Sequence, residues 1–346
     1  MSLEMIVAGA MIVSLMFYAL LGGADYGGGV WDLFARGRRG ALQRELIAEA
    51  IGPVWEANHV WLILVVVILF TGFPQAFAVI ATALHIPLTL LLIGIVLRGS
   101  AFTFRTYDSE RDRVQQRWSR VFSIASIITP ILLGITLGAI ASGTIKVENG
   151  VVTSGFVSSW LAPFPFAVGF FALALFAFLA AVYLTLETED EKLQDDFRAR
   201  ALFSGAMVGV LALMVFLLSG SGAPSVRAGL TASGWALPLH LATAASAIGA
   251  FYFLWKRRYA LARLCAACQV GLILWGWALA QFPFIVEPDI TINSAAAPPA
   301  TLRLLLIALG VGALVLFPSF YYLFRVFKGK TAFAVLSEET ATKEQN

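Results

Sequence analysis

The chain has 346 residues, of which 59% are hydrophobic and only 13% are charged, and its formal net charge is +3. A soluble domain carries about 25% charged residues, so this composition indicates an integral membrane protein. Runs of about 20 apolar residues are long enough to cross a bilayer as helices, and the short alternating strands of a membrane β-barrel do not occur. The small net charge, with its cations in loops, argues against a nucleic-acid partner.

The sequence predicts an all-α, polytopic membrane protein with about nine transmembrane helices. We expect one integral membrane domain, 1–346, that ends in a short tail, 328–346. The N-terminal segment has an acid and no Lys or Arg before its apolar run, so we interpret it as the first span and not as a cleavable signal peptide. The expected spans are 5–34, 53–72, 76–98, 117–144, 162–187, 199–219, 235–255, 260–281 and 301–327.

The basic residues predict an orientation for these spans. If the N-terminus lies outside, 21 of the 24 Lys and Arg residues fall on the cytoplasmic side, and only Lys146, Arg227 and Arg303 fall on the other side. This distribution obeys the positive-inside rule, and it supports an odd number of spans. The tail, 328–346, is then cytoplasmic.

Loops and glycines add three expectations. The outside loop 282–300 is rich in proline and should be an irregular, non-helical surface loop. The acidic inside loop 187–197 should be solvated. The Gly23–Gly27 spacing is a GxxxG pattern, which permits close helix approach in the first span.

Two acids lie where a bilayer makes a charge expensive. Asp25 sits among glycines near the inner end of the first span, and Glu56 lies about one turn into the second, after the helix-start pair Gly52–Pro53. An ionisable residue inside a membrane segment is a functional-site hypothesis by default. The helix N-terminal dipole favours a charged Glu56 and burial favours the neutral form, which suits a group that accepts and passes protons.

The residues around Glu56 extend this hypothesis. His59 shares a helix face with Glu56 at spacing i,i+3, Trp55 pairs with His59 at i,i+4, and Asn58 can hold a water molecule. The predicted proton path comprises Glu56, Asp25, Trp55, Asn58 and His59.

Structural roles for the same acids stay open as alternatives. Glu56 could be a structural carboxylate bound to a neighbouring Arg or Trp. Asp25 could cap a glycine-broken helix or be the charge partner of Arg98, which ends the predicted third span on the same side. Asp32 is expected at the membrane interface, where it would be solvated.

The remaining chemistry-bearing residues indicate no catalytic or metal site in this chain. The histidines His59, His85 and His240 have neither the spacing of a metal pair nor a recognisable haem ligand set, so we expect hydrogen-bonding roles for the last two. Cys265 and Cys268 share a face of the eighth span, where close packing is favoured over redox chemistry. No dinucleotide or phosphate-binding motif is present.

Several motifs carry a family resemblance. They are GGADYGGGVWDL at 22–33, GPVWEANHVWL at 52–62, FPQAFA at 73–78, HIPLTLLLIGIVLRGSAFTFR at 85–105 and LAQFPFIVEPDITI at 279–292. Over nearly all its length the chain resembles subunit II of the cytochrome bd-type quinol oxidases. The compact length and the glutamate in WEAN resemble the cyanide-insensitive branch.

This resemblance implies a fold and a complex. The fold would be two four-helix bundles plus a peripheral helix, with the N-terminus outside the bacterial cytoplasmic membrane. Subunit II would pair with a subunit I that carries two b-type haems, one d-type haem and the quinol-oxidising loop. The complex oxidises quinol and reduces oxygen to water, and it builds a proton gradient without pumping. A structural quinone or lipid and a small accessory subunit would be further partners in some members.

The resemblance also implies site residues. In the family, the acid of the W-(D/E)-x-N motif lines a proton path at the subunit interface, and that acid is Glu56 here, beside Trp55 and Asn58. Asp25 would lie near it, with Arg98 close by.

Two alternatives from other classes are a secondary transporter and a passive assembly scaffold. The transporter is disfavoured because the acids lie near the inner edge of the membrane and no pair of broken helices occurs in matching halves.

Overall fold

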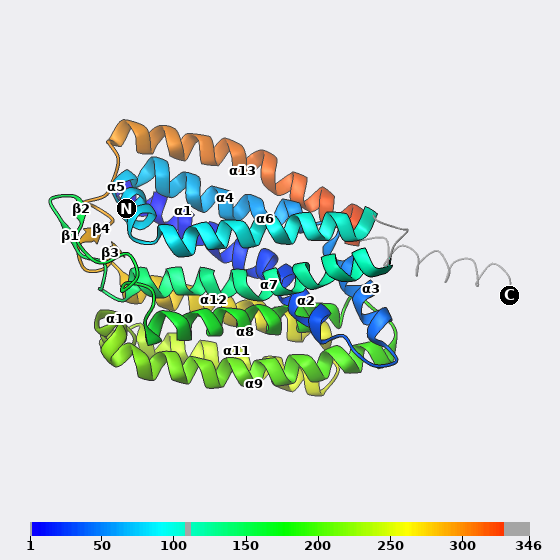
Figure 1. The fold of residues 1–346 in the computed structure, drawn as a ribbon. Helices are drawn as coiled ribbons and strands as arrows, with labels where there is room; N and C mark the ends of the chain where they lie inside the picture. The colour runs from blue at the N-terminus through cyan, green and yellow to red at the C-terminus, as the bar shows by residue number, and fades with distance from the viewer. Residues whose placement is uncertain (1, 108–111, 329–346) are drawn as a thin grey trace.

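The computed structural model describes residues 2–107 and 112–328, and its long helices lie side by side with roughly parallel axes (Figure 1). Within these ranges, nine helical stretches are long and apolar enough to cross a membrane, so the predicted number of spans is confirmed. The predicted tail lies outside the described residues except for Lys328, and so do residues 108–111 of an arginine-rich turn.

The elements follow one another as helices with two short strand pairs. The helices are α1 (Leu3–Phe17), the π-helical turn η1 (Tyr18–Gly22), α2 (Gly23–Phe34), α3 (Gly40–Ile51), α4 (Trp55–Gly72), α5 (Pro74–Ala83), α6 (His85–Tyr107), α7 (Asp112–Ala141), α8 (Pro163–Leu184), α9 (Glu191–Gly222), α10 (Pro224–Ala232), α11 (Ala236–Trp255), α12 (Tyr259–Gln281) and α13 (Pro299–Lys328). The strands are β1 (Val147–Glu148), β2 (Val151–Val152), β3 (Phe284–Val286) and β4 (Ile290–Thr291).

The prediction of one continuous third span over 76–98 is wrong. Pro74 starts the short helix α5, and Leu84 leaves helical geometry with φ −115° and ψ 22°. The spanning helix is α6, whose apolar stretch is His85–Phe104, so Arg98 lies inside this span and not at its end. The apolar composition is continuous across the break, which is why hydropathy alone does not reveal it.

Helix α8 lies at the centre of the fold. It packs against α2, α7 and α9. In the most apolar 18-residue stretch of α8, 67% of the residues are buried, compared with 11% in the corresponding stretch of α13. Its approach to α2 depends on glycine. A Cβ atom at Gly23 would lie 2.5 Å from the Phe176 ring, and one at Gly27 would lie 1.9 Å from the Phe176 carbonyl oxygen. The predicted close approach at Gly23–Gly27 is therefore confirmed. The division into two four-helix bundles stays a prediction.

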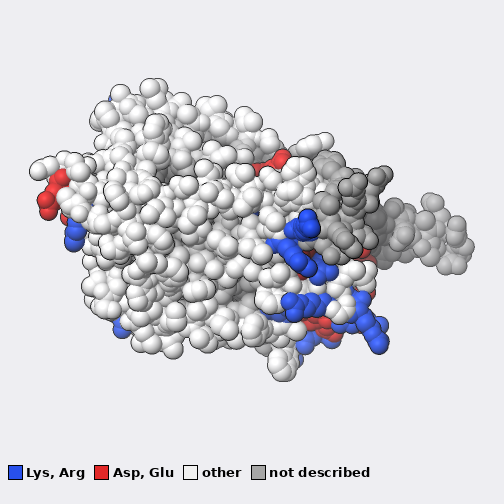
Figure 2. All heavy atoms as spheres, in the orientation of Figure 1, with Lys and Arg blue, Asp and Glu red and all other residues white. Residues whose placement is uncertain are grey.

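Lys and Arg side chains gather at one end of the helices, whereas the side walls in this view are almost free of charge (Figure 2). We call this the charged end; it includes the loop before α3, the loop between α8 and α9, and the turn between α11 and α12. The N-terminus and both strand pairs lie at the opposite end (Figure 1). We call that the strand end.

The 282–298 loop at the strand end is non-helical, as predicted, but it is not irregular throughout and is partly buried. Strands β3 and β4 pair antiparallel, and Val286 and Glu287 are almost completely buried. The Glu287 backbone N–H donates to the Ile140 carbonyl at 3.1 Å, which ties the loop to α7. Burial raises the pKa of the Glu287 carboxyl, and a hydrogen bond with Ser225 acts in the opposite direction.

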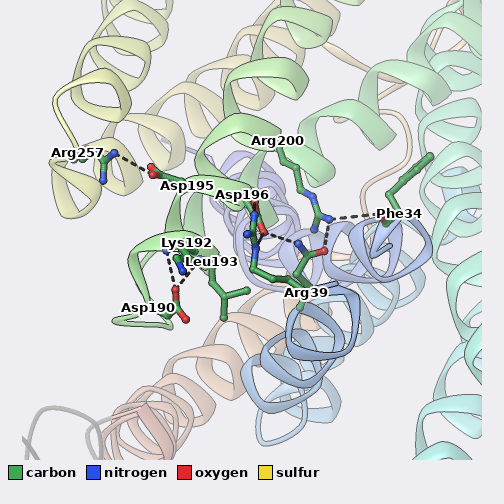
Figure 3. Close-up of polar contacts among 10 residues, drawn as sticks. Phe34, Arg39, Asp190, Lys192, Leu193, Asp195, Asp196, Arg200 and Arg257 are labelled. Carbon is green, nitrogen blue, oxygen red and sulfur yellow. Dashed lines mark hydrogen bonds and ion pairs between the residues drawn. The ribbon is translucent and has the colours of Figure 1, made fainter. Parts of the chain in front are cut away.

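The acidic loop at the charged end is bonded to its neighbours and not merely solvated (Figure 3). Asp190 caps α9 by accepting hydrogen bonds from the backbone N–H groups of Lys192 and Leu193. Asp196 accepts two hydrogen bonds from Arg39, at 2.8 and 2.5 Å, and these raise the pKa of the Arg39 guanidinium. This correction follows from tertiary structure, because Arg39 is distant from the loop in sequence.

Asp196→Asn should lower the thermal unfolding midpoint only slightly, by less than about 2 °C. The bidentate pair with Arg39 is lost, but both side chains are partly exposed, and solvent screens their attraction. Thermal melts in detergent at low and at high salt would measure the effect, with the exposed Glu189→Gln as control. A large fall that persists at high salt would contradict a screened surface pair.

Candidate functional site

Two polar side chains from different spans meet inside the protein. Asn58, one turn into α4, donates a hydrogen bond from Nδ2 to Asp25 Oδ2 at 2.7 Å. Both are buried, with 5% of Asp25 and 2% of Asn58 exposed. Asp25 lies nine residues before the end of α2 at Phe34, which corresponds to about 14 Å along the helix axis. This hydrogen bond directly joins two of the five residues of the predicted path.

A π-helical turn precedes Asp25 and changes the register of the first span. The turn, η1, occupies Tyr18–Gly22 and leads directly into α2. It is accompanied by a hydrogen bond of 3.1 Å between the hydroxyls of Tyr18 and Tyr26, which are eight residues apart. Single π-turns inside α-helices occur often at functional sites. Sequence reasoning missed both tyrosines, although two phenols inside an apolar span were a usable signal.

Arg98 lies in the same site, over the aromatic rings of Tyr26 and Phe122. Its guanidinium carbon is 4.6 Å from the centroid of the Tyr26 ring, a geometry typical of a cation–π contact. Nε donates to Ser126 Oγ at 3.3 Å, and the side chain is only 1% exposed. Its Nη2 atom has no hydrogen-bond partner among the described residues.

His59 and Trp55 complete this cluster. The His59 ring centroid is 6.0 Å from that of Tyr18, 6.2 Å from that of Tyr26 and 6.2 Å from that of Trp55. The predicted contact between Trp55 and His59 is therefore present. Within the described part of the chain, His59 Nδ1 is buried and has no hydrogen-bond partner.

Glu56 does not join the cluster. Its side chain is exposed. Because Glu56 lies two residues before Asn58 on α4, the two side chains point about 200° apart around the helix axis. His59 turns toward the tyrosines, so the expected shared face of Glu56 and His59 does not form a contact pair. The outward side of α4 and the neighbouring α6 is instead covered by exposed apolar side chains, namely Ile63, Val66, Val67, Phe70, Leu92, Ile93, Val96 and Leu97.

The expectation that Asp32 is solvated is wrong. Asp32 is only 2% exposed and accepts a hydrogen bond from Ser123 Oγ at 3.0 Å. The end of α2 is covered because Gly29 lies directly against Ser126 of α7. On its other side, Trp31 Nε1 donates to the Ala177 carbonyl of α8 at 2.7 Å. A residue near the end of a predicted span was thus buried by neighbouring helices.

A cavity of about 60 Å³ adjoins the buried pair. Asp25 and Asn58 line it together with Tyr183, Glu187 and Arg263 from the charged end. This volume accommodates a few water molecules. It is far below the roughly 300 Å³ at which pockets for larger organic ligands begin, so a haem or a quinone does not fit.

Sequence reasoning missed Glu187 and Arg263 as lining residues. The available signals were the position of Glu187 at the end of the predicted fifth span and that of Arg263 near the start of the eighth. His85 and His240 bond to backbone carbonyls, of Thr82 at 3.0 Å and Leu230 at 2.9 Å. Among the described residues, no group of three His, Cys, Asp or Glu side chains could hold a metal ion.

The fold and the site define a polytopic α-helical membrane protein with a buried polar cluster and a small cavity near its charged end. Residues 3–327 match the family described as cytochrome bd terminal oxidase subunit II. The match covers nearly the whole chain, and the protein belongs to this family. It is therefore a multi-pass component of a terminal oxidase complex that contains haem and a partner subunit I.

Individual relatives agree with this assignment. A Bacillus subtilis protein assigned as a cytochrome bd menaquinol oxidase subunit II is 24% identical over 338 residues, covering 94% of this chain and 96% of the relative. Escherichia coli cytochrome bd-I ubiquinol oxidase subunit 2 is 26% identical over 211 residues, covering 60% of this chain and 54% of the relative. A chain of the bd oxidase from Geobacillus thermodenitrificans has the same fold, with a TM-score of 0.80 at 20% identity, covering 95% of this chain and 100% of that chain.

Proposed function

We propose that this protein supports the haem-bearing subunit I in quinol oxidation and in the reduction of oxygen to water, and that it lines a proton-uptake path from the cytoplasm. The observation that carries the proton path is the buried hydrogen bond between Asn58 and Asp25 beside a water-sized cavity. Family membership supports the oxidase and weighs against the secondary transporter.

The proposed location is the bacterial cytoplasmic membrane, with the N-terminus outside and the charged end in the cytoplasm. The gathering of Lys and Arg at that end supports this orientation (Figure 2). Protons consumed at the haem site would then enter at the charged end and pass Asp25 on their way to the partner subunit.

Asp25 and Asn58 have different tasks in this proposal. Asn58 binds one carboxylate oxygen of Asp25 and holds its orientation, while the carboxyl exchanges a proton with water in the cavity. Tyr26 and His59 follow Asp25 and Asn58 in the chain and contact each other, and Tyr26 also contacts Arg98, so this cluster would shield the pair from bulk water.

Glu56 would act at the boundary with the partner. It is exposed on the apolar outward side of α4, and an apolar surface of this kind marks an interaction face. We infer that subunit I covers this side, which would bury Glu56 between the subunits and place it after Asp25 in the path.

The haem chemistry is assigned to the partner. The cavity is too small for a haem, and the described histidines lie apart or bond to backbone carbonyls. When bound in the complex, the haems supply electron transfer to oxygen. A structural quinone, a lipid or a small accessory subunit would need a surface other than this cavity.

The oxidase assignment is tested on the tagged protein, expressed in its native host and purified in mild detergent. We expect haem bands in the reduced-minus-oxidised visible spectrum, a second large membrane polypeptide and quinol-dependent oxygen consumption. A colourless, solitary protein that stays folded would overturn the proposal and bring the transporter back.

Glu56→Gln should lower turnover of the assembled complex by about tenfold or more, because the amide keeps the shape of the side chain but cannot transfer a proton. Oxygen consumption per haem would be measured over a range of pH, with Glu49→Gln on the exposed side of α3 as a matched control. Unchanged turnover at every pH would remove Glu56 from the path and favour the passive scaffold.

A further inference from the structure

The cavity beside Asp25 has a second polar side, formed by residues that the proposed path does not yet use. Glu187 follows the end of α8 by three residues, and Arg263 lies one turn after the start of α12 at Tyr259. The Arg263 guanidinium carbon is 4.7 Å from the centroid of the Tyr183 ring, and Tyr183 also lines the cavity. The cavity is therefore lined both by the buried pair and by two ionisable residues, Glu187 and Arg263, from the charged end.

We propose that this cavity is a hydrated antechamber of the proton path, and that Glu187 is the carboxylate that collects protons at its mouth. This inference rests on the proposed function, because it assigns the cytoplasmic entrance of the same path. Glu187 would be a positioning and relay residue, since it touches neither quinol nor haem.

The size and lining of the cavity fit water. A buried water needs roughly 10–15 Å³ and two to four polar partners, so about 60 Å³ holds several molecules. Carboxylate, amide, phenol and guanidinium groups provide those partners at Glu187, Asp25, Asn58, Tyr183 and Arg263.

Proton transfer through such a cavity is balanced at each step. The protonated Glu187 carboxyl releases its proton to a water molecule, and the water chain releases one proton to the Asp25 carboxylate. Glu187 then takes a new proton from the cytoplasm. No electron moves in this relay, and no further reactant is needed.

Few of the described residues that line the cavity are charged. The titratable or charged groups that line the cavity are Asp25 from α2, Tyr183 from α8, Glu187 itself and Arg263 from α12. The lining residues of α3, of the turn between α3 and α4, of α4 and of α13 are uncharged, namely Ala50, Ile51, Val54, Asn58 and Phe324. Arg263 is the cationic side chain among these described lining residues.

The test compares Glu187→Gln with a matched neighbour, Glu189→Gln, which is exposed and does not line the cavity. Turnover of the purified complex per haem would be measured from about pH 6 to about pH 9. We expect Glu187→Gln to match the unmodified complex at low pH and to lose on the order of tenfold at high pH, where free protons are scarce. Glu187→Asp should retain activity, and Glu189→Gln should behave as the unmodified complex does.

Two outcomes separate this inference from the proposed function. If Glu187→Gln follows Glu189→Gln at every pH while Asp25→Asn is slow, the entrance assignment is wrong and the path through Asp25 stands. If Asp25→Asn is also fully active, the proton path itself fails.

Water access gives a readout that does not depend on activity. Ala24→Cys places a thiol in the cavity lining, in a background where Cys265 and Cys268 are replaced by Ser. A small hydrophilic thiol reagent applied from the charged end, in inverted vesicles, should label it. Ala167→Cys, at a fully buried position of α8, should stay unlabelled. An unreactive Ala24→Cys in a folded complex would show a dry cavity and overturn the inference.

Discussion

Asp25→Asn is expected to reduce quinol-dependent oxygen consumption per haem by on the order of 100-fold, while the complex still assembles. The amide has the shape of the carboxyl, and its oxygen can still accept the hydrogen bond from Asn58. It cannot release a proton, so the proposed relay would stop at the most deeply buried carboxyl that borders the cavity. Turnover of the purified complex, normalised to haem content, is the measurement.

Asp32→Asn is the matched control for this change. Asp32 is as deeply buried as Asp25 and lies on the same helix, but it does not line the cavity. Its hydrogen bond from Ser123 survives in the amide, so we expect near-normal turnover. A low yield of the Asp25→Asn complex with normal activity per haem would show that Asp25 is a structural carboxylate.

Gly27→Ala is expected to be the most disruptive glycine-to-alanine change among the glycines that the structure describes. The added Cβ would lie 1.9 Å from the backbone oxygen of Phe176 and 2.7 Å from the Cβ of Ala180. A carbonyl of the central helix α8 cannot rotate away, so α2 and α8 must separate. Overpacking of this kind costs about 3 kcal/mol or more, and we expect the thermal midpoint of the complex to fall by roughly 5 °C or more.

Gly209→Ala on α9 separates this effect from the general consequence of removing a glycine. No atom lies within 4 Å of a Cβ built at Gly209, so the methyl group meets open space. We expect an unchanged or slightly higher midpoint, because alanine favours a helix over glycine. Equal midpoints for the Gly27→Ala and Gly209→Ala complexes would contradict the close approach of α2 and α8.

The general architecture was predictable because transfer into a bilayer depends on composition summed along one segment. That local quantity predicts α8, α9 and α13 as spans without knowledge of their neighbours. Hydropathy does not reveal the break at Leu84, because the residues on both sides of Leu84 are apolar although they belong to two different helices, α5 and α6.

The sequence by itself determined the number of spans, the close contact at Gly23–Gly27 and the presence of acids inside apolar segments, because these depend on local composition and spacing. Only the tertiary structure decided which acids are buried together. Helix α7 covers Asp32, α4 brings Asn58 to Asp25, and the rotation of α4 turns Glu56 outward. Burial depends on neighbours from distant parts of the chain, and no local pattern in the sequence encodes their positions.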